Sequence, residues 1–61
     1  MFDIKNAEGV VKAVVREGKE WQVYVRGIYW FARSIKPADL APGASIRVVG
    51  QDSIKLLIEP A

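Results

Sequence analysis

Apolar and polar residues alternate with a period of two along most of the chain, a pattern that predicts β-strands rather than helices. The clearest alternation lies on either side of Gly27, where two such segments are separated by a single compact turn. Two alternating segments joined in this way predict a β-hairpin. A run of β-branched residues near the start and two later alternating runs predict three more strands. The chain is therefore expected to form five strands, over residues 9–15, 19–26, 28–34, 45–50 and 53–59.

The segments between these strands contain residues typical of turns. Gly18 follows the first strand and can adopt a positive φ, and Gln51-Asp52 is expected to form the last turn. Residues 36–43 hold two prolines and a glycine, which exclude a regular strand and allow at most one helical turn, with Leu40 pointing inward. Residues 1–8 match no strand pattern. We therefore expect a lead-in or linker stub over 1–8 and one folded domain over 9–60.

Five strands in groups of three and two, joined by an irregular connector, predict an all-β fold, a small five-stranded antiparallel barrel. Closing the barrel removes the exposed edges that a flat sheet of this size would leave. The alternation then assigns ten apolar side chains to the interior: Trp21, Val23, Val25, Ile28, Trp30, Ile46, Val48, Ile54, Leu56 and Ile58.

Composition limits the chemistry that such a barrel can perform. The chain has 61 residues, which corresponds to one domain, and it contains neither cysteine nor histidine. Disulfides, thiolate or imidazole metal sites, and catalysis by these two residue types are therefore excluded. The formal net charge is only +2, and the basic residues are scattered along the chain rather than clustered. This distribution argues against a dedicated nucleic-acid-binding protein.

No segment has the roughly 20 apolar residues that a membrane-spanning helix needs, and the start of the chain does not resemble a signal peptide. The chain taken alone is therefore expected to be soluble.

Candidate catalytic groups are weak. A serine–lysine pair would need a buried, deprotonated lysine beside a hydroxyl, and both Lys36 and Lys55 are expected to be solvated. Glu17 and Glu20 lack the apolar surroundings that raise a carboxyl pKa. The dispersed aspartates suit no calcium loop, and the isolated glycines form no phosphate-binding loop. The sequence thus predicts no enzyme, no cofactor and no metal.

Outward-facing aromatic residues on the predicted hairpin are the only candidate site. Three rings share a face with arginines, and the candidate surface is Tyr24, Arg26, Tyr29, Phe31 and Arg33. Aromatic rings interleaved with guanidinium groups serve either as protein-interaction hot spots or as platforms for unpaired bases. A third interpretation is structural, in which Tyr29 or Phe31 covers one end of the barrel or packs on residues 1–8.

Ordered motifs along the chain carry a resemblance to a known family. They are VYVRG at 23–27, WFARS at 30–34, LAPG at 40–43 and LLIEP at 56–60, preceded by a glycine-led strand. In this order they resemble the C-terminal domain of the NfeD family over residues 9–60. The most specific piece is WFARS after the hairpin, whereas LLIEP alone is common.

The resemblance implies an OB-like barrel that lacks the usual OB helix. It also implies a barrel tethered to upstream transmembrane helices in a membrane-associated parent protein, which works with stomatin- and flotillin-like partners. Because neither those helices nor a protease region is present here, we expect either an excised fragment or a free-standing domain. The function expected is that of a non-enzymatic protein-interaction domain, with self-association as a variant. The alternative is a module that binds single-stranded nucleic acid on the same face.

Overall fold

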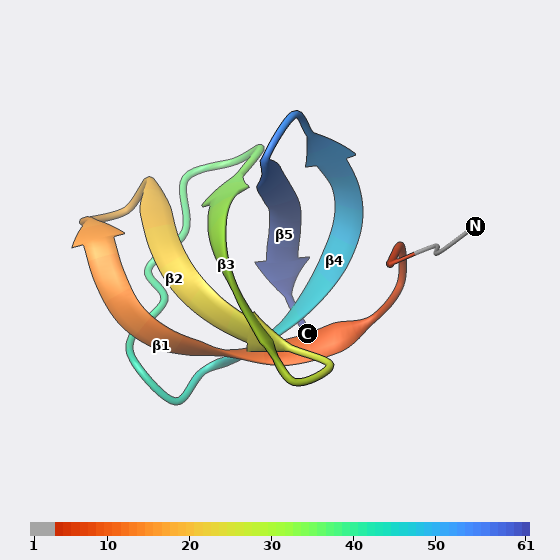
Figure 1. Cartoon of the computed structure of the whole chain (residues 1–61). Coiled ribbons are helices and arrows are strands. Elements are labelled where there is room, and N and C mark those ends of the chain that lie inside the picture. Colours follow the sequence, from red (N-terminus) through yellow and green to blue (C-terminus); the bar gives the residue numbers. More distant parts are fainter. Residues whose placement is uncertain (1–3) are drawn as a thin grey trace.

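The structure, a computed structural model that describes residues 4–61, is a closed five-stranded β-barrel (Figure 1). Neighbouring strands follow the order β1-β2-β3-β5-β4 around the barrel. No helix occurs among the described residues, so the predicted fold class is confirmed. The strands are β1 (Glu8–Arg16), β2 (Glu20–Val25), β3 (Ile28–Ser34), β4 (Ser45–Asp52) and β5 (Lys55–Pro60).

Strand β1 closes the barrel by pairing with two neighbours. Its first residues, from Glu8 to Val10, pair with β4, and the strand pairs with β2 from Gly9 to Arg16. The register with β2 shifts between Val11 and Ala13 and again between Val14 and Arg16, and such bulges bend a strand and increase its twist. Gly9 lies where β1 contacts both neighbours, and a Cβ atom there would lie 2.5 Å from the carbonyl oxygen of Tyr24. Glycine is thus the residue that lets the two backbones approach.

One strand pair departs from the antiparallel prediction. β3 and β5 run parallel, and their register joins only Ala32–Ser34 to Leu56–Ile58. The other four pairs are antiparallel. Alternation of side chains is the same in both kinds of pair, so the sequence pattern could not distinguish them.

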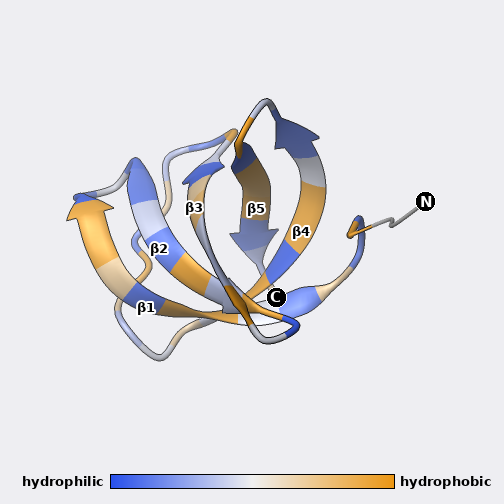
Figure 2. Ribbon diagram, viewed as in Figure 1, coloured by the Kyte–Doolittle hydropathy of each residue, from blue (hydrophilic) through white to orange (hydrophobic). Residues whose placement is uncertain are grey.

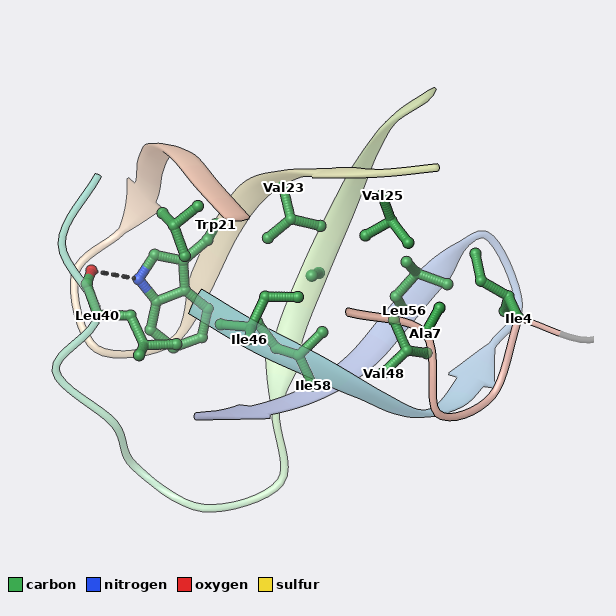
Figure 3. Packing of buried hydrophobic residues seen from close by; sticks show 12 residues of the cluster. Ile4, Ala7, Trp21, Val23, Val25, Leu40, Ile46, Val48, Leu56 and Ile58 are labelled. Atoms are coloured by element: carbon green, nitrogen blue, oxygen red, sulfur yellow. Dashed lines mark hydrogen bonds between the residues drawn. The ribbon is translucent and has the colours of Figure 1, made fainter. Parts of the chain in front are cut away.

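The interior is entirely apolar in the described part of the chain (Figure 3). Apolar bands alternate with polar ones along the strands in Figure 2, as the period of two requires. Seven of the ten predicted inward residues are buried, and the core comprises Ile4, Ala7, Val11, Trp21, Val23, Val25, Ala32, Leu40, Ile46, Val48, Leu56 and Ile58.

Three predicted core residues lie elsewhere. Trp30 is only partly buried against the core, and Ile28 is half exposed at the end of the β2–β3 hairpin. Ile54 is 77% exposed, because Asp52 pairs with Lys55 and the turn therefore falls at Ser53-Ile54 rather than at Gln51-Asp52. Ser53 adopts the left-handed conformation that this tight turn needs (φ 59°).

Part of the segment predicted as a lead-in packs with the barrel. Residues 1–3 lie outside the described residues, but Ile4 and Ala7 are buried in the core. The backbone N–H of Asn6 donates to the carbonyl of Val48 (2.7 Å), and the N–H of Val48 donates to the carbonyl of Ala7 (2.8 Å). Residues 4–7 thereby extend the β1–β4 side of the barrel.

The connector between β3 and β4 contains no helical turn. Leu40 points inward as predicted, and its carbonyl accepts a hydrogen bond from the indole of Trp21 (Figure 3). Further along, Gly43 and Ala44 exchange backbone hydrogen bonds with Val11. These contacts fasten the irregular segment to β1 and β2.

Candidate interaction surface

Tyr24 and Tyr29 form the centre of the predicted surface. They are directly opposite each other in the β2–β3 register, and their ring centroids lie 4.9 Å apart with the planes tilted by 58°. Such tilted pairs are a favourable geometry for two aromatic rings. The amino group of Lys12 lies 5.6 Å from the Tyr24 ring centroid, within the range of a cation–π contact. Sequence reasoning missed Lys12, because only the register of β1 brings it here.

Phe31 extends this aromatic surface along β3. It lies two residues beyond Tyr29 and therefore on the same face of the strand. Tyr29 and Phe31 are both more than half exposed. We call Tyr24, Tyr29 and Phe31 the aromatic face. A large, exposed apolar surface of this kind is typical of interaction sites.

Arg26 is placed at the tip of the hairpin by the geometry of the turn. Val25 pairs with Ile28, which leaves a two-residue loop, and both loop residues have positive φ (Arg26 52°, Gly27 82°). This is the type I′ turn that matches the twist of a hairpin. The turn therefore carries a cation at the end of the aromatic face.

Arg33 is on the same strand face, but its guanidinium is directed elsewhere. It forms an ion pair with Asp52 at the end of β4. The structure thus brings Tyr24, Tyr29 and Phe31 together. The charge of Arg33 is instead paired with Asp52, at the other end of the barrel. Asp52 was not recognised as its partner from sequence, because the two residues meet only through the barrel topology.

The opposite end of the barrel carries an ionic cluster centred on Glu20. Its carboxylate contacts Arg16 (3.4 Å) and forms a hydrogen-bonded ion pair with Lys55. The hydrogen bond from Lys55 holds the pKa of Glu20 below its ordinary value, and the charges of Lys55, Arg16 and Arg33 act in the same direction. Burial opposes this shift. Glu20 is therefore an anion that ties strands together rather than a proton donor.

Two open hollows beside the connector offer no catalytic arrangement among the described residues. The first, about 660 Å³, contains Ser34 and Lys55, but the Lys55 amino group is bonded to Glu20 rather than to a hydroxyl. The second, about 510 Å³, lies between the connector, Val49 of β4 and the end of β5. No group of three or more acidic residues that could hold a metal ion occurs within residues 4–61. Over the same residues, no helix has the length and apolar character needed to cross a membrane.

The family follows from comparison of the whole chain with known proteins. Residues 4–60 match the family model described as the NfeD-like C-terminal, partner-binding domain. The chain belongs to the NfeD-like family. The match begins at Ile4, in agreement with the burial of this side chain in the NfeD-like barrel. No curated protein matches the chain.

Solved structures agree with the NfeD-like fold. The chain is similar to the C-terminal domain of stomatin operon partner protein 1510-C from Pyrococcus horikoshii, with 28% identity and a TM-score of 0.85 over 95% of this chain and 88% of that one. A second similar structure is the soluble domain of a membrane protein implicated in regulation of membrane protease activity from Corynebacterium glutamicum. It has 22% identity and a TM-score of 0.80 over 93% of this chain and 90% of that one, and it supports the fold alone.

Proposed function

We propose that this NfeD-like barrel is a non-enzymatic interaction domain that binds a protein partner through the outer face of the β2–β3 hairpin. The observation that carries the proposal is the aromatic face, three rings exposed side by side on one surface of a partner-binding domain. Tyrosine and arginine are enriched among the residues that dominate binding energy. The proposed contact residues are Tyr24, Arg26, Tyr29, Phe31 and Arg33.

These residues have different roles in the proposed interface. Tyr29 and Phe31 are the most exposed rings and act as anchors, and Tyr24 supports Tyr29 from the neighbouring strand. Arg26 supplies charge at one end of the aromatic face. Arg33 contributes from the rim, and its ion pair with Asp52 has to rearrange if its guanidinium is to reach a partner.

The proposed partner is a stomatin- or flotillin-like protein, and the parent of this domain is proposed to be membrane-associated. Support for the partner comes from the first similar structure, which is described as a domain of a stomatin operon partner protein. Membrane association of the parent is what the family resemblance implies. A partner that assembles at a membrane would concentrate a tethered barrel beside it, so that modest affinity at the aromatic face would be sufficient.

The test is a binding titration of the barrel against a purified stomatin-like protein from the same genome, by biolayer interferometry. Tyr29→Ser and Phe31→Ser should each weaken binding by at least tenfold, because both anchors lose most of their buried contact area. Ile54→Ser is the control, since it removes an apolar side chain that is even more exposed (77%) and lies at a different hairpin tip. Equal affinities for all three variants would refute the aromatic face as the interface.

The alternative ligand of the same face is single-stranded nucleic acid. Its bases could stack on the three rings, and Lys12 could neutralise a phosphate. Titration with labelled oligonucleotides at several salt concentrations distinguishes the two. Binding tighter than about micromolar that weakens steeply with salt would favour nucleic acid and refute the protein-partner proposal.

A further inference from the structure

The first half of β3 has a neighbour on only one side. β2 pairs with β3 along its whole length, but β5 joins the other edge only from Ala32 onward. Within residues 4–61, the strand registers join residues 28–31 to β2 alone, except for the carbonyl of Phe31, which the parallel register directs to Leu56. Residues 28–31 therefore form an open strand edge in a barrel that is otherwise closed, at the hairpin end seen at the bottom of Figure 1.

The register defines which backbone groups this edge presents. In a hairpin with a two-residue loop, the residues flanking the loop are hydrogen-bonded to each other and the next pair is not. Ile28 and Trp30 therefore bond to β2, whereas the N–H and C=O of Tyr29 and the N–H of Phe31 point to the open edge. This spacing of donors and acceptor is the pattern that an added antiparallel strand satisfies.

The side chains of the open edge make it unusual. Residues 28–31 read Ile-Tyr-Trp-Phe, and Ile28, Tyr29 and Phe31 are 52%, 59% and 53% exposed. Natural proteins normally protect a strand edge with charges, proline or a bulge, and none of these occurs within this segment. Trp30 adds a further feature, since its indole N–H is enclosed yet has no acceptor among the described residues.

We infer that the edge of β3 at residues 28–31 binds an extended segment of a partner protein by strand addition. The bound segment runs antiparallel to β3, hydrogen-bonds to Tyr29 and Phe31, and places alternate apolar side chains on the aromatic face. This inference rests on the proposed function, since it assigns to the same surface a mode of binding and a partner chemistry. It adds a requirement for backbone contact that docking on the rings alone does not have.

Positive charges near the open edge indicate which residues the bound segment carries at its carboxyl-terminal end. Arg26 lies at the hairpin tip just before the edge, and Lys12 lies beside Tyr24 without an ion pair in residues 4–61. In an antiparallel arrangement, the carboxyl-terminal end of the added strand lies next to Arg26. The segment is therefore apolar at alternate positions with acidic residues at its carboxyl-terminal end.

A second copy of this chain fits the edge less well. Each copy already carries β5 from Ala32 onward, so two barrels could share only the four residues before it. An antiparallel pair centred on Trp30 would also place Arg26 of one copy beside Ser34 and Arg33 of the other, bringing like charges together at both ends. A free peptide segment has neither restriction.

The first experiment uses a synthetic probe, acetyl-Thr-Val-Thr-Val-Thr-Asp-Glu, and amide hydrogen exchange followed by NMR. Saturating probe should slow exchange of the Tyr29 and Phe31 amides by at least tenfold and leave those of Ile28 and Trp30 nearly unchanged. A probe ending in Lys-Lys should bind about tenfold more weakly, as should the acidic probe to Arg26→Asn. Protection of both pairs of amides alike, or no protection at millimolar probe, would overturn the inference.

The second experiment separates backbone contact from ring contact, which a chain of 61 residues allows by chemical synthesis. Replacing the Phe31 amide N–H by an ester oxygen removes the outward donor and keeps the ring, so probe affinity should fall about tenfold. The control is the Phe31→Ala variant, which keeps the donor and removes the ring. Unchanged affinity of the ester form would refute strand addition.

The same two variants distinguish failure of this inference from failure of the proposed function. A stomatin-like protein that loses affinity with Phe31→Ala but not with the ester form docks on the rings alone, which would sustain the proposed function and overturn strand addition. A dimer in analytical ultracentrifugation that protects the same amides would instead identify a second copy as the occupant, and would also overturn the inference.

Discussion

The indole Nε1 of Trp21 donates a 3.0 Å hydrogen bond to the carbonyl oxygen of Leu40, which lies in the irregular connector. Trp21 is fully buried, and this bond satisfies its only polar atom. The same contact satisfies a connector carbonyl and holds the Leu40 side chain against the core. One side chain thus joins the barrel wall to a segment that has no strand pairing of its own.

Trp21→Phe should therefore lower the free energy of unfolding by about 2–4 kcal/mol, through the lost volume and the unsatisfied Leu40 carbonyl. Trp30→Phe is the matched comparison. Its indole N–H has no acceptor in residues 4–61, so replacing it should cost less than about 1 kcal/mol. Urea denaturation of both variants measures the difference, and equal losses would contradict the role assigned to the hydrogen bond.

Gly9→Ala should destabilise the barrel by about 2–3 kcal/mol, because the new Cβ would lie 2.5 Å from both the Tyr24 carbonyl oxygen and Val25 Cγ2. Backbone cannot move away without opening the β1–β2 pair. Gly50→Ala provides the control, since a Cβ there would meet Leu57 Cδ1 at an ordinary 3.5 Å. A thermal melt that ranks Gly50→Ala as the more harmful change would show that the close approach at Gly9 is not the limiting contact.

Arg26→Asn should stabilise the barrel by about 0.5–1 kcal/mol. Arg26 has a φ of 52°, and asparagine occupies this left-handed conformation at the first position of a type I′ turn more readily than arginine. Gly27→Ala should act in the opposite direction by about 1–2 kcal/mol, because φ at Gly27 is 82°. Chemical denaturation checks both signs. Destabilisation by Arg26→Asn would mean that the arginine side chain stabilises the turn more than its backbone strains it.

Acidification should weaken the barrel partly through Glu20. The pKa of Glu20 is lowered from 4.5 in the folded state, chiefly by Lys55, so its contribution to stability is complete above pH 4.5 and is lost as the pH falls through the folded pKa. Glu20→Gln should consequently flatten the decline of stability that the unchanged protein shows as the pH falls below about 4.5. Glu17→Gln, which removes a carboxylate without an ion pair in the described chain, should leave the slope nearly unchanged. Identical slopes for both variants would argue against this linkage.

The sequence predicted the strands well because most of them show a local alternation of apolar and polar residues. The β2–β3 hairpin and the alternation around Trp21 follow from residues within a few positions of one another. Ile54 was misplaced because alternation from Leu56 continues through it, whereas the pairing of Asp52 with Lys55 decides where the turn falls.

Contacts between segments distant in the sequence could not be predicted, because they depend on which strands become neighbours. Ile4 and Ala7 have no periodic pattern of their own, and their burial depends on β4. The ion pair between Arg33 and Asp52 and the position of Lys12 over Tyr24 likewise depend on which strands become neighbours. The aromatic face was predicted as a set of residues, but its open edge depends on where β5 begins to pair with β3.

The pairing of residues 4–7 with Val48 has a consequence for how the chain folds. Three of the five strand pairs are hairpins between consecutive strands, which form with little loop-closure entropy. The contacts of Asn6 and Ala7 with Val48 instead join positions about forty residues apart. We expect these contacts to form after the hairpins, so that the amide of Val48, which donates to Ala7, reports the final closure of the barrel in a pulse-labelling experiment.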